Sequence, residues 1–323
     1  MNTSAQSVRV LQAGERQSDR WDGEMVSIGG VSPAEQPMAL RATAKINLFL
    51  KVLDRRPDGY HTIETVYQSV GLADRLWFDV TGDEIVLECH DSDLPVGKEN
   101  LVVRAADLMR RVFPEQVGGL RIDLEKRIPV GEGLGGGSAD AAATLRACNE
   151  IFHLGLSAGE LRVLGSQIGM DVPFLIEGGR AIGRERGDRI EALEMRDTTW
   201  AVIAVPFVAI STRWAYEQMD QTRPPELPAI EVFVERLSQE PLARWAGMCG
   251  NNFESVVFPA YPEVRQLRDR LLQAGCAAAF LSGSGASVVG LTDDPERAAR
   301  VAQEVRRLCR LAEAVPFLNA VGA

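Results

Sequence analysis

The pattern of apolar and polar positions becomes regular at Leu40. Apolar and polar residues alternate from there, and residues 46 to 50 are mostly apolar. This pattern predicts a strand over residues 40 to 53 that carries Lys45. Further strands are predicted near residues 62 to 72, 75 to 80, 84 to 90 and 119 to 126. A helix is predicted over about residues 100 to 113, because Pro114 ends its periodic pattern.

Helical and strand patterns then alternate to the end of the chain. A helix is predicted from Ser138 to about residue 153, a second from a Ser157 cap to Ile168, and a glycine-rich hairpin near residues 178 to 190. Later helices are predicted near residues 212 to 219, 227 to 238, 252 to 273 and 294 to 309, and later strands near residues 200 to 206, 277 to 282, 286 to 291 and 313 to 318. The length and this order predict an α+β protein of two domains, residues 39 to 195 and 196 to 323.

Residues 1 to 38 differ from the rest, because glutamine, serine, glycine and charged residues mix there without sustained periodicity. They predict a disordered or loosely attached N-terminal extension. Its acidic residues are untypical of a signal or transit peptide, so no targeting role is assigned.

Composition narrows the class of protein. The 323 residues are 46% hydrophobic and 25% charged, and no apolar run reaches membrane-spanning length, so no membrane partner is expected. The net charge of −10, from 45 acidic and 35 basic residues, argues against a nucleic-acid partner. Five scattered cysteines without metal-type spacing predict reduced thiols and a cytoplasmic location. The pattern is compatible with a monomer or a homodimer.

Residues 129 to 138, the first glycine loop, hold five glycines within seven positions and lead directly into an alanine-rich helix. Backbone at positive φ and close approach of N–H groups to a ligand are possible at Gly131, Gly133, Gly135, Gly136 and Gly137. Ser138 is expected to cap the helix, whose first-turn N–H groups and dipole favour an anion. The strand, loop and helix order therefore predicts phosphate binding.

Three kinds of glycine loop compete for this segment. A Walker A loop is excluded because no lysine with serine or threonine follows the glycines. The dinucleotide fingerprint G-x-G-x-x-G is formally present, but residues 120 to 125 alternate as in a half-exposed strand, whereas the corresponding strand of a dinucleotide fold is buried on both faces. An oxidoreductase is thus a distant alternative. A protein kinase is disfavoured because no H-R-D or D-F-G run follows.

Three motifs in order resemble the GHMP small-molecule kinases, the superfamily of galactokinase, homoserine kinase, mevalonate kinase and phosphomevalonate kinase. The motifs are residues 44 to 48 (AKINL), residues 129 to 142, and residues 281 to 287 (LSGSGAS). The resemblance implies the two-domain fold of that superfamily, with a ribosomal-protein-S5-like sheet and helices first and a ferredoxin-like layer second. It also implies an active site in the cleft between the halves.

Within that superfamily the chain is most similar to the kinases of 4-diphosphocytidyl-2-C-methyl-D-erythritol. The similarity rests on residues 56 to 61 (RPDGYH), residues 133 to 138 (GLGGGS) and residues 169 to 174 (GMDVPF). It implies phosphorylation of the substrate's 2-hydroxyl group by ATP with Mg²⁺, in non-mevalonate isoprenoid precursor synthesis. The expected partner is a small molecule that carries a cytidine diphosphate group.

Lys45 and Asp171 are the candidate catalytic residues. Phosphoryl transfer needs an aligned hydroxyl group, a group that takes its proton, and charge that offsets the phosphates. Asp171 lies in an otherwise apolar segment, where an unpartnered carboxylate is costly, and the resemblance makes it the base. Lys45 would pair with it and polarise the hydroxyl group. A structural ion pair, or a lysine at a strand edge, is the alternative.

The resemblance also assigns two sets of binding residues. The ATP-binding set is Asn100, Leu101, Lys126, Pro129, Gly131, Gly133, Leu134, Gly135, Gly136, Gly137 and Ser138, with the Ser138 hydroxyl close to phosphate or Mg²⁺. The substrate-binding set is Asn47, Tyr60, His61, Tyr216, Ser284 and Gly285. In it, Tyr60 stacks on cytosine, His61 reads the edge of the base, and Tyr216 closes the other face. By residue type alone, Asn100 equally fits a helix cap, Lys126 a surface charge and Tyr216 a core residue.

Three positions depart from the family pattern. Glu132 places a carboxylate where a small residue is usual, and it would weaken ATP binding unless it points away. Ala139 replaces a usual serine, and Met170 replaces a small residue. Two rival functions stay open: a GHMP kinase that acts on homoserine, mevalonate or a sugar, and a non-catalytic regulatory protein with the same fold.

Overall fold

The computed structural model describes residues 37–89, 94–195 and 198–321. The predicted N-terminal extension lies outside these residues apart from its last two, and Met38 already begins the first strand. The boundary proposed between residues 195 and 196 stays a prediction.

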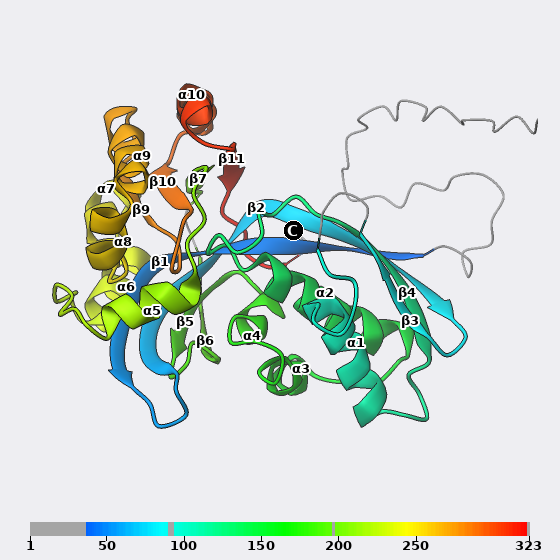
Figure 1. Ribbon diagram of the computed structural model, residues 1–323. Helices are drawn as coiled ribbons and strands as arrows, with labels where there is room; N and C mark the ends of the chain where they lie inside the picture. Colours follow the sequence, from blue (N-terminus) through cyan, green and yellow to red (C-terminus); the bar gives the residue numbers. More distant parts are fainter. Residues whose placement is uncertain (1–36, 90–93, 196–197, 322–323) are drawn as a thin grey trace, which may run out of the picture. The chain divides into compact units, whose positions relative to one another are not determined.

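A long antiparallel ribbon is the centre of the larger sheet (Figure 1). It consists of β1 (Met38–Arg55) and β2 (His61–Thr81), whose middle positions are buried on both faces. Next to β2 lie β4 (Gly119–Glu125) and β3 (Ile85–Glu88), while β8 (Gly250–Asn251) pairs with β1. The hairpin of β5 (Arg180–Arg184) and β6 (Arg189–Leu193) pairs with another part of β2. Since the β1–β8 and β3–β4 pairs are parallel and the others antiparallel, the sheet is mixed.

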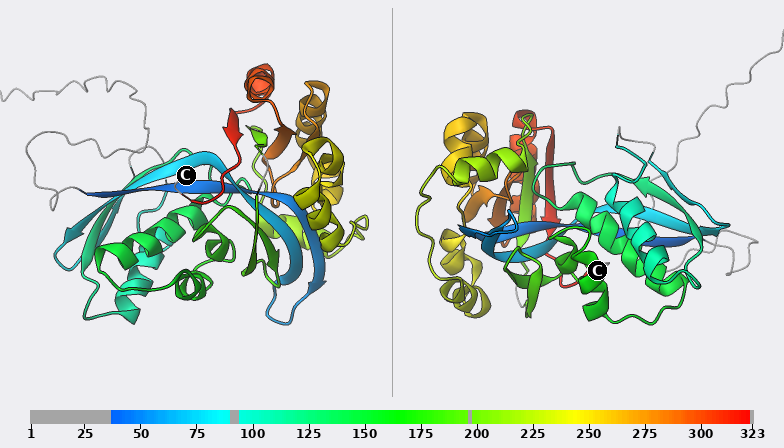
Figure 2. Two further views of the ribbon diagram at one scale, coloured as in Figure 1. Left: turned by 180° about the vertical axis from the view of Figure 1, so that it is seen from behind. Right: turned by 60° about the horizontal axis from the view of Figure 1, so that its bottom comes forward.

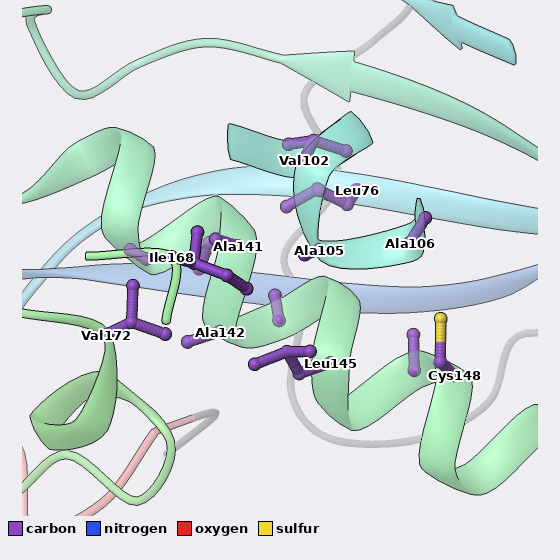
Figure 3. Close-up of a cluster of buried hydrophobic side chains, with 14 of the residues drawn as sticks. Leu76, Val102, Ala105, Ala106, Ala141, Ala142, Leu145, Cys148, Ile168 and Val172 are labelled. Carbon is purple, nitrogen blue, oxygen red and sulfur yellow. The ribbon is translucent and has the colours of Figure 1, made fainter. Parts of the chain in front are cut away.

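Four helices cover one face of this sheet (Figure 1). They are α1 (Leu101–Val112), α2 (Gly136–Ile151), α3 (Ala158–Gly165) and α4 (Val172–Leu175). The buried side of α2 is mostly alanine, and Figure 3 shows Ala141 and Ala142 in the same cluster as Val102 of α1 and Leu76 of β2. Because alanine side chains are short, α2 lies close to the sheet and its first turn is brought near β1.

A second, antiparallel sheet has the order β11-β7-β10-β9. Its strands are β7 (Trp200–Val205), β9 (Ala278–Leu281), β10 (Val288–Thr292) and β11 (Leu311–Pro316). The accompanying helices are α5 (Thr212–Met219), α6 (Ile230–Gln239), α7 (Leu242–Trp245), α8 (Glu254–Ala260), α9 (Pro262–Gln273) and α10 (Pro295–Val305). Figure 2 shows this sheet on the opposite side of β1 and β2 from α1 to α4. One buried cluster joins Ile46 and Phe49 of β1 to Ile203 of β7 and Val289 of β10, so a shared apolar core links the two sheets.

Three predictions of elements were wrong. The strands predicted at residues 62 to 72 and 75 to 80 are one strand, β2, because Asp74 between them is buried and accepts a hydrogen bond from the Ile128 N–H group (2.8 Å). The helix predicted over residues 252 to 273 is divided into α8 and α9, since Pro262 has no N–H group with which to continue α8. Ser138 does not cap α2, which begins two residues earlier with Gly135 as its N-cap. The short elements α4, α7 and β8 were missed because each spans only about one period, too little for a pattern to repeat.

Candidate active site

Lys45 and Asp171 lie together, as predicted. The Lys45 ammonium, on β1, is 3.4 Å from Asp171 Oδ2 at the start of α4. Lys45 also donates to Asn47 Oδ1 (2.8 Å), and the Asn47 amide donates to Thr65 Oγ1 on β2 (2.8 Å). The two-residue period of the strand puts Lys45 and Asn47 on one face, as expected. Each polar group of this buried cluster therefore has a partner that fixes its orientation.

Tyr67 is a member of this cluster that the sequence did not reveal. It lies opposite Asn47 in the β1–β2 register, and its hydroxyl donates to Asp171 Oδ1 (3.1 Å). Burial, and next the charge of Asp171, raise the pKa of Tyr67 well above its usual value, so the hydroxyl stays protonated and remains a donor. Tyr67 thus holds one oxygen of Asp171, while the other faces Lys45.

The first glycine loop requires glycine at specific positions. Gly131, Gly133 and Gly135 have φ of 76°, 78° and 71°. A Cβ atom on Gly133 would lie 2.0 Å from the Ser282 carbonyl oxygen, and one on Gly135 would lie 2.9 Å from Lys45 Cγ. The Leu134 carbonyl accepts a hydrogen bond from the Lys45 N–H group (2.9 Å), which ties the loop to β1. The backbone can approach its neighbours this closely only without side chains.

The loop opens onto a cavity of about 260 Å³. Its lining includes Gly136, Gly137 and Ser138, in the first turn of α2, where no side chain caps the helix. Lys45 and Asp171 also line it. First-turn N–H groups without intrahelical partners, the positive end of the helix dipole and a lysine make up the donor set that a polyphosphate needs. The residues therefore fit the phosphate ligand that the sequence predicted.

A second cavity, of about 690 Å³, adjoins the first. Asp171, Ser138, Tyr67, Thr212 and Tyr216 line both cavities. Only the second is lined by Tyr60 and His61, and by the arginines Arg55, Arg186 and Arg213. The carboxylate of Asp171 is thus accessible from both cavities, so a group held in one can react with a group held in the other.

The three predicted base-binding residues meet in the second cavity. His61 and Tyr216 stack on each other, with ring centroids 4.9 Å apart and planes at 19°. The edge of Tyr216 also packs against Phe253, so it has the core contacts of the alternative interpretation as well. Burial, and next Asp171, raise the pKa of Tyr216 to about 12. Tyr60 is 50% exposed, with the Arg186 guanidinium 5.6 Å from its ring centroid.

Asp220 orients His61, and no pattern in the sequence pointed to it. Its Oδ1 atom is 2.7 Å from His61 Nε2, and its Oδ2 atom is 3.5 Å from the Arg55 guanidinium. Asp220 directly follows α5, so its position depends on where that helix lies. The imidazole is therefore held by a carboxylate on one side and by Tyr216 on its face.

Residues 282 to 287, the second glycine loop, face the first one, as expected. The Ser282 hydroxyl donates to the Gly133 carbonyl (3.0 Å), and Asn251 on β8 donates to the carbonyl groups of Leu281 and Gly283. Ser284 lines the first cavity and lies 2.9 Å, hydroxyl to hydroxyl, from Thr212. Gly285, by contrast, lines neither cavity.

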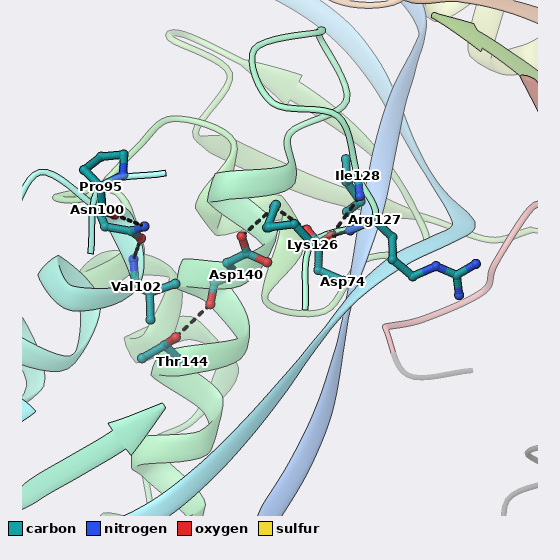
Figure 4. A network of polar contacts seen from close by, with 9 residues as sticks. All are labelled: Asp74, Pro95, Asn100, Val102, Lys126, Arg127, Ile128, Asp140 and Thr144. Carbon is teal, nitrogen blue, oxygen red and sulfur yellow. Dashed lines mark hydrogen bonds and ion pairs between the residues drawn. The ribbon is translucent and has the colours of Figure 1, made fainter. Parts of the chain in front are cut away.

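Several residues of the predicted ATP-binding set also lie outside both cavities: Asn100, Leu101, Lys126, Pro129 and Leu134. Asn100 caps α1 by accepting a hydrogen bond from the Val102 N–H group (2.9 Å; Figure 4). Leu101 lies behind the loop, 3.6 Å from where a Cβ atom on Gly137 would be. Leu101 and Lys126 therefore lie next to the first turn of α2.

Lys126 is buried between Asp74 and Asp140, so its interpretation as a surface charge was wrong (Figure 4). Its ammonium donates to Asp140 Oδ2 (2.8 Å) and to Asp74 Oδ2. Burial raises the pKa of Asp140 to about 8; Lys126 opposes this effect and the Asp74 charge reinforces it. Asp74 also accepts hydrogen bonds from the Arg127 and Ile128 N–H groups. The three charged side chains therefore fix the segment that follows β4 and, through Asp140, the start of α2.

Glu132 points toward the second glycine loop. Its carboxylate forms an ion pair with Arg310 and accepts a hydrogen bond from the Ala286 N–H group (3.2 Å). The residue is only 2% exposed. The carboxylate that departs from the family pattern is therefore neutralised by an arginine.

The described residues contain no group of three or more His, Cys, Asp or Glu side chains that could hold a metal ion. A metal at this site would depend on the oxygens of a bound phosphate together with single side chains such as Asp171. No helix in the described part of the chain is long and apolar enough to cross a membrane. Cys148, Cys249, Cys276 and Cys309 are free thiols, as predicted.

Known protein families and solved structures share this fold. The model of the GHMP kinase N-terminal domain matches residues 100–179, and the model of the C-terminal domain matches residues 223–311. A homoserine kinase from Cytophaga hutchinsonii has the same fold, with a TM-score of 0.65 and 18% identity over 91% of this chain and 98% of that one. Fold and site together define a GHMP kinase.

Closer relatives specify the family. The chain is 40% identical to the 4-diphosphocytidyl-2-C-methyl-D-erythritol kinase of Enterococcus faecalis, over 83% of this chain and 95% of that protein. It is 42% identical to the enzyme of that name from Moorella thermoacetica, with the same coverage. A crystal structure of a 4-(cytidine 5'-diphospho)-2C-methyl-D-erythritol kinase superposes with a TM-score of 0.74 at 35% identity, over 88% of this chain and 100% of that one. The chain therefore belongs to the 4-diphosphocytidyl-2-C-methyl-D-erythritol kinase family.

Gly133→Ala should impair nucleotide binding, since its Cβ atom would collide with the Ser282 carbonyl oxygen. Gly131→Ala is the matched control, because Gly131 has a similar φ but nothing within 4 Å of an added Cβ atom. We expect the Kd for Mg-ATP, measured by titration, to rise at least about tenfold more in Gly133→Ala than in Gly131→Ala. Equal effects would show that backbone strain alone, and not the close approach of the loops, determines the requirement for glycine.

Asp140→Asn should change how stability depends on pH. Because the pKa of Asp140 is raised, its carboxyl group stays protonated in the folded state between about pH 4 and about pH 8. The same group is deprotonated in the unfolded chain over this range. The stabilisation from this group is therefore complete at low pH and is lost as the pH rises toward 8. Asparagine does not titrate, so the variant should not lose this stability. The difference in Tm, variant minus wild type, should therefore increase from pH 5 to pH 8. A difference in Tm that stays constant over this range contradicts the assignment.

Proposed function

We propose that the protein transfers the γ-phosphoryl group of Mg-ATP to the 2-hydroxyl group of 4-diphosphocytidyl-2-C-methyl-D-erythritol. One observation carries the proposal: Asp171, in contact with Lys45, lines both the cavity at the first glycine loop and the cavity that contains Tyr60 and His61. The names of the relatives supply the identity of the substrate. We infer a cytosolic location, because Cys148, Cys249, Cys276 and Cys309 are free thiols.

The nucleotide is held by its phosphates. N–H groups from Gly133 to Ser138 surround the β- and γ-phosphates at the start of α2, where the helix dipole favours negative charge. Mg²⁺, when bound with the nucleotide, offsets the charge of the phosphate oxygens. Lys45 adds a fixed positive charge on the side of the acceptor.

The acceptor hydroxyl group lies beside the Lys45–Asp171 pair, within reach of both side chains. Its oxygen forms a bond to the γ-phosphorus as the bond from that phosphorus to the bridging oxygen breaks, and ADP leaves. The hydroxyl proton passes to Asp171 Oδ2, while Tyr67 holds Oδ1 by its hydrogen bond. Asn47 orients Lys45, since it accepts one of the ammonium protons.

The second cavity has the chemistry of a cytidine diphosphate site. Tyr60 offers an exposed ring for stacking on the base, and His61, oriented by Asp220, offers a polar edge. Arg55, Arg186 and Arg213 line the same cavity, and guanidinium groups suit a diphosphate. In the structure Arg55 pairs with Asp220 and Arg186 with Asp188, so these two arginines would exchange or share their carboxylate partners with the ligand. Homoserine, mevalonate and simple sugars carry neither a base nor a diphosphate, so this lining favours the cytidine substrate over theirs.

A direct test is ADP release by the purified protein with Mg-ATP and one candidate acceptor at a time: 4-diphosphocytidyl-2-C-methyl-D-erythritol, homoserine, mevalonate or galactose. We expect turnover with the first alone, because only that molecule can occupy the aromatic cavity. Turnover with one of the others would reassign the substrate within the superfamily. ATP binding without turnover on any acceptor would support the non-catalytic alternative.

Asp171→Asn and Lys45→Ala should each lower kcat by about 10² to 10⁴, since general acid–base catalysis contributes on that order. In Asp171→Asn the Kd for Mg-ATP should change by less than about threefold, because the loop, the start of α2 and Lys45 remain. Lys51→Ala is the matched control: it removes a lysine from the same strand whose ammonium contacts the Leu227 carbonyl, away from both cavities. Near-normal kcat in either site variant would refute the role proposed for that residue.

A further inference from the structure

Glu132 lies in the first glycine loop with its carboxylate almost completely buried, at 1% side-chain exposure. The residue lines the first cavity, next to the glycines that surround the phosphates in the proposed function. A carboxylate at such a place repels a polyphosphate unless a positive charge balances it. Its contacts therefore bear directly on nucleotide binding.

The contacts of Glu132 lead to the second glycine loop and to Arg310. One carboxylate oxygen forms an ion pair with Arg310, and the other accepts a hydrogen bond from the Ala286 N–H group (3.2 Å). The Glu132 carbonyl accepts a further hydrogen bond from the Ser287 N–H group (3.3 Å). Together with the bond from the Ser282 hydroxyl to the Gly133 carbonyl, these interactions join the two glycine loops along their length.

Arg310 belongs to the second sheet. It immediately precedes β11, and its N–H group donates to the Val205 carbonyl at the end of β7 (2.9 Å). Its side chain is 42% exposed and lines neither the first nor the second cavity. Arg310 therefore acts on the nucleotide site through Glu132 rather than by touching a ligand.

We propose that Glu132 and Arg310 are a pair of positioning residues that hold the first glycine loop against the second in its nucleotide-binding geometry. Arg310 balances the charge of a carboxylate that lies beside the phosphate site, and Glu132 transmits the position of the second sheet to the loop. This inference rests on the proposed binding of ATP at the first glycine loop. The conformation of the first glycine loop thus depends on an interaction between the two sheets as well as on its own glycines.

The pair has a characteristic pattern of mutational effects. Arg310→Ala leaves a buried carboxylate without its counter-charge, so it should weaken Mg-ATP binding by about 10- to 100-fold. The double variant Glu132→Ala with Arg310→Ala removes that carboxylate as well. It should recover the part of the loss that the unbalanced charge causes, because the hydrogen bonds from the Ser287 N–H group and the Ser282 hydroxyl still join the loops. The kcat at saturating ATP should stay within about threefold of wild type, because neither residue touches the reacting atoms. A purely structural role predicts a lower Tm in Arg310→Ala, no change in affinity, and no rescue.

The experiment is titration of Mg-ATP into the full chain and its variants, with Tm and steady-state kinetics measured in parallel. Arg307→Ala is the control, since it removes an exposed arginine three residues away in the 3₁₀ turn Arg306–Leu308. Equal affinity of wild type and Arg310→Ala, or loss of affinity without rescue in the double variant, would overturn the pairing. Failure of the wild-type chain to bind ATP would instead overturn the proposed function and this inference with it.

If Arg310→Ala does not fold, the variants Arg310→Lys and Arg310→Gln test the same question, namely whether Mg-ATP binding requires a positive charge at this position. Both shorten or alter the side chain, but only lysine keeps the positive charge. We expect Arg310→Lys to bind Mg-ATP within about fivefold of wild type and Arg310→Gln to bind it about tenfold or more weakly. Equal affinities in these two variants would exclude charge neutralisation as the role of Arg310.

Discussion

The two glycine loops approach each other so closely that a single methyl group on Gly133 would overlap the Ser282 carbonyl oxygen. This approach joins a loop of the larger sheet to a turn of the smaller one, and it closes one side of the cavity at the start of α2. The alanine-rich face of α2 makes a second contribution, since it lets the helix lie close to β1. Short side chains thus bring backbone N–H groups, Lys45 and Asp171 into one cavity.

Charge is paired at each buried position around that cavity. Lys45 contacts Asp171, Lys126 lies between Asp74 and Asp140, and Glu132 is bonded to Arg310. Unpaired charges in such surroundings would be costly, so these pairs fix the geometry of the loop and of both its flanking elements. A chain of net charge −10 can offer a site to an anion in this way, because the buried carboxylates near the cavity are balanced and the uncapped N-terminus of α2 faces it.

Much of the fold follows from local patterns. The strands around Lys45, the hairpin of β5 and β6, and helices such as α1 and α5 occur where periodicity and caps predicted them. The errors have physical causes: Asp74 is compatible with a continuous β2 only because it bonds to the backbone before the first glycine loop. Ser138 is not a cap because Gly135, in a left-handed conformation, begins the helix earlier. In each case a contact or a backbone conformation outweighed local propensity.

The sequence by itself determined the parts of the site that depend on neighbouring residues: the glycine loop that enters a helix, and Lys45 with Asn47 on one strand face. Its motifs also identified the superfamily and made Asp171, Tyr60 and His61 candidates for the site. The tertiary structure alone decided which distant groups complete the site. Tyr67 reaches Asp171 through the β1–β2 register, Asp220 reaches His61 from the end of α5, and Arg310 reaches Glu132 from the second sheet. Such contacts depend on how whole elements pack, and no spacing along the chain encodes that arrangement.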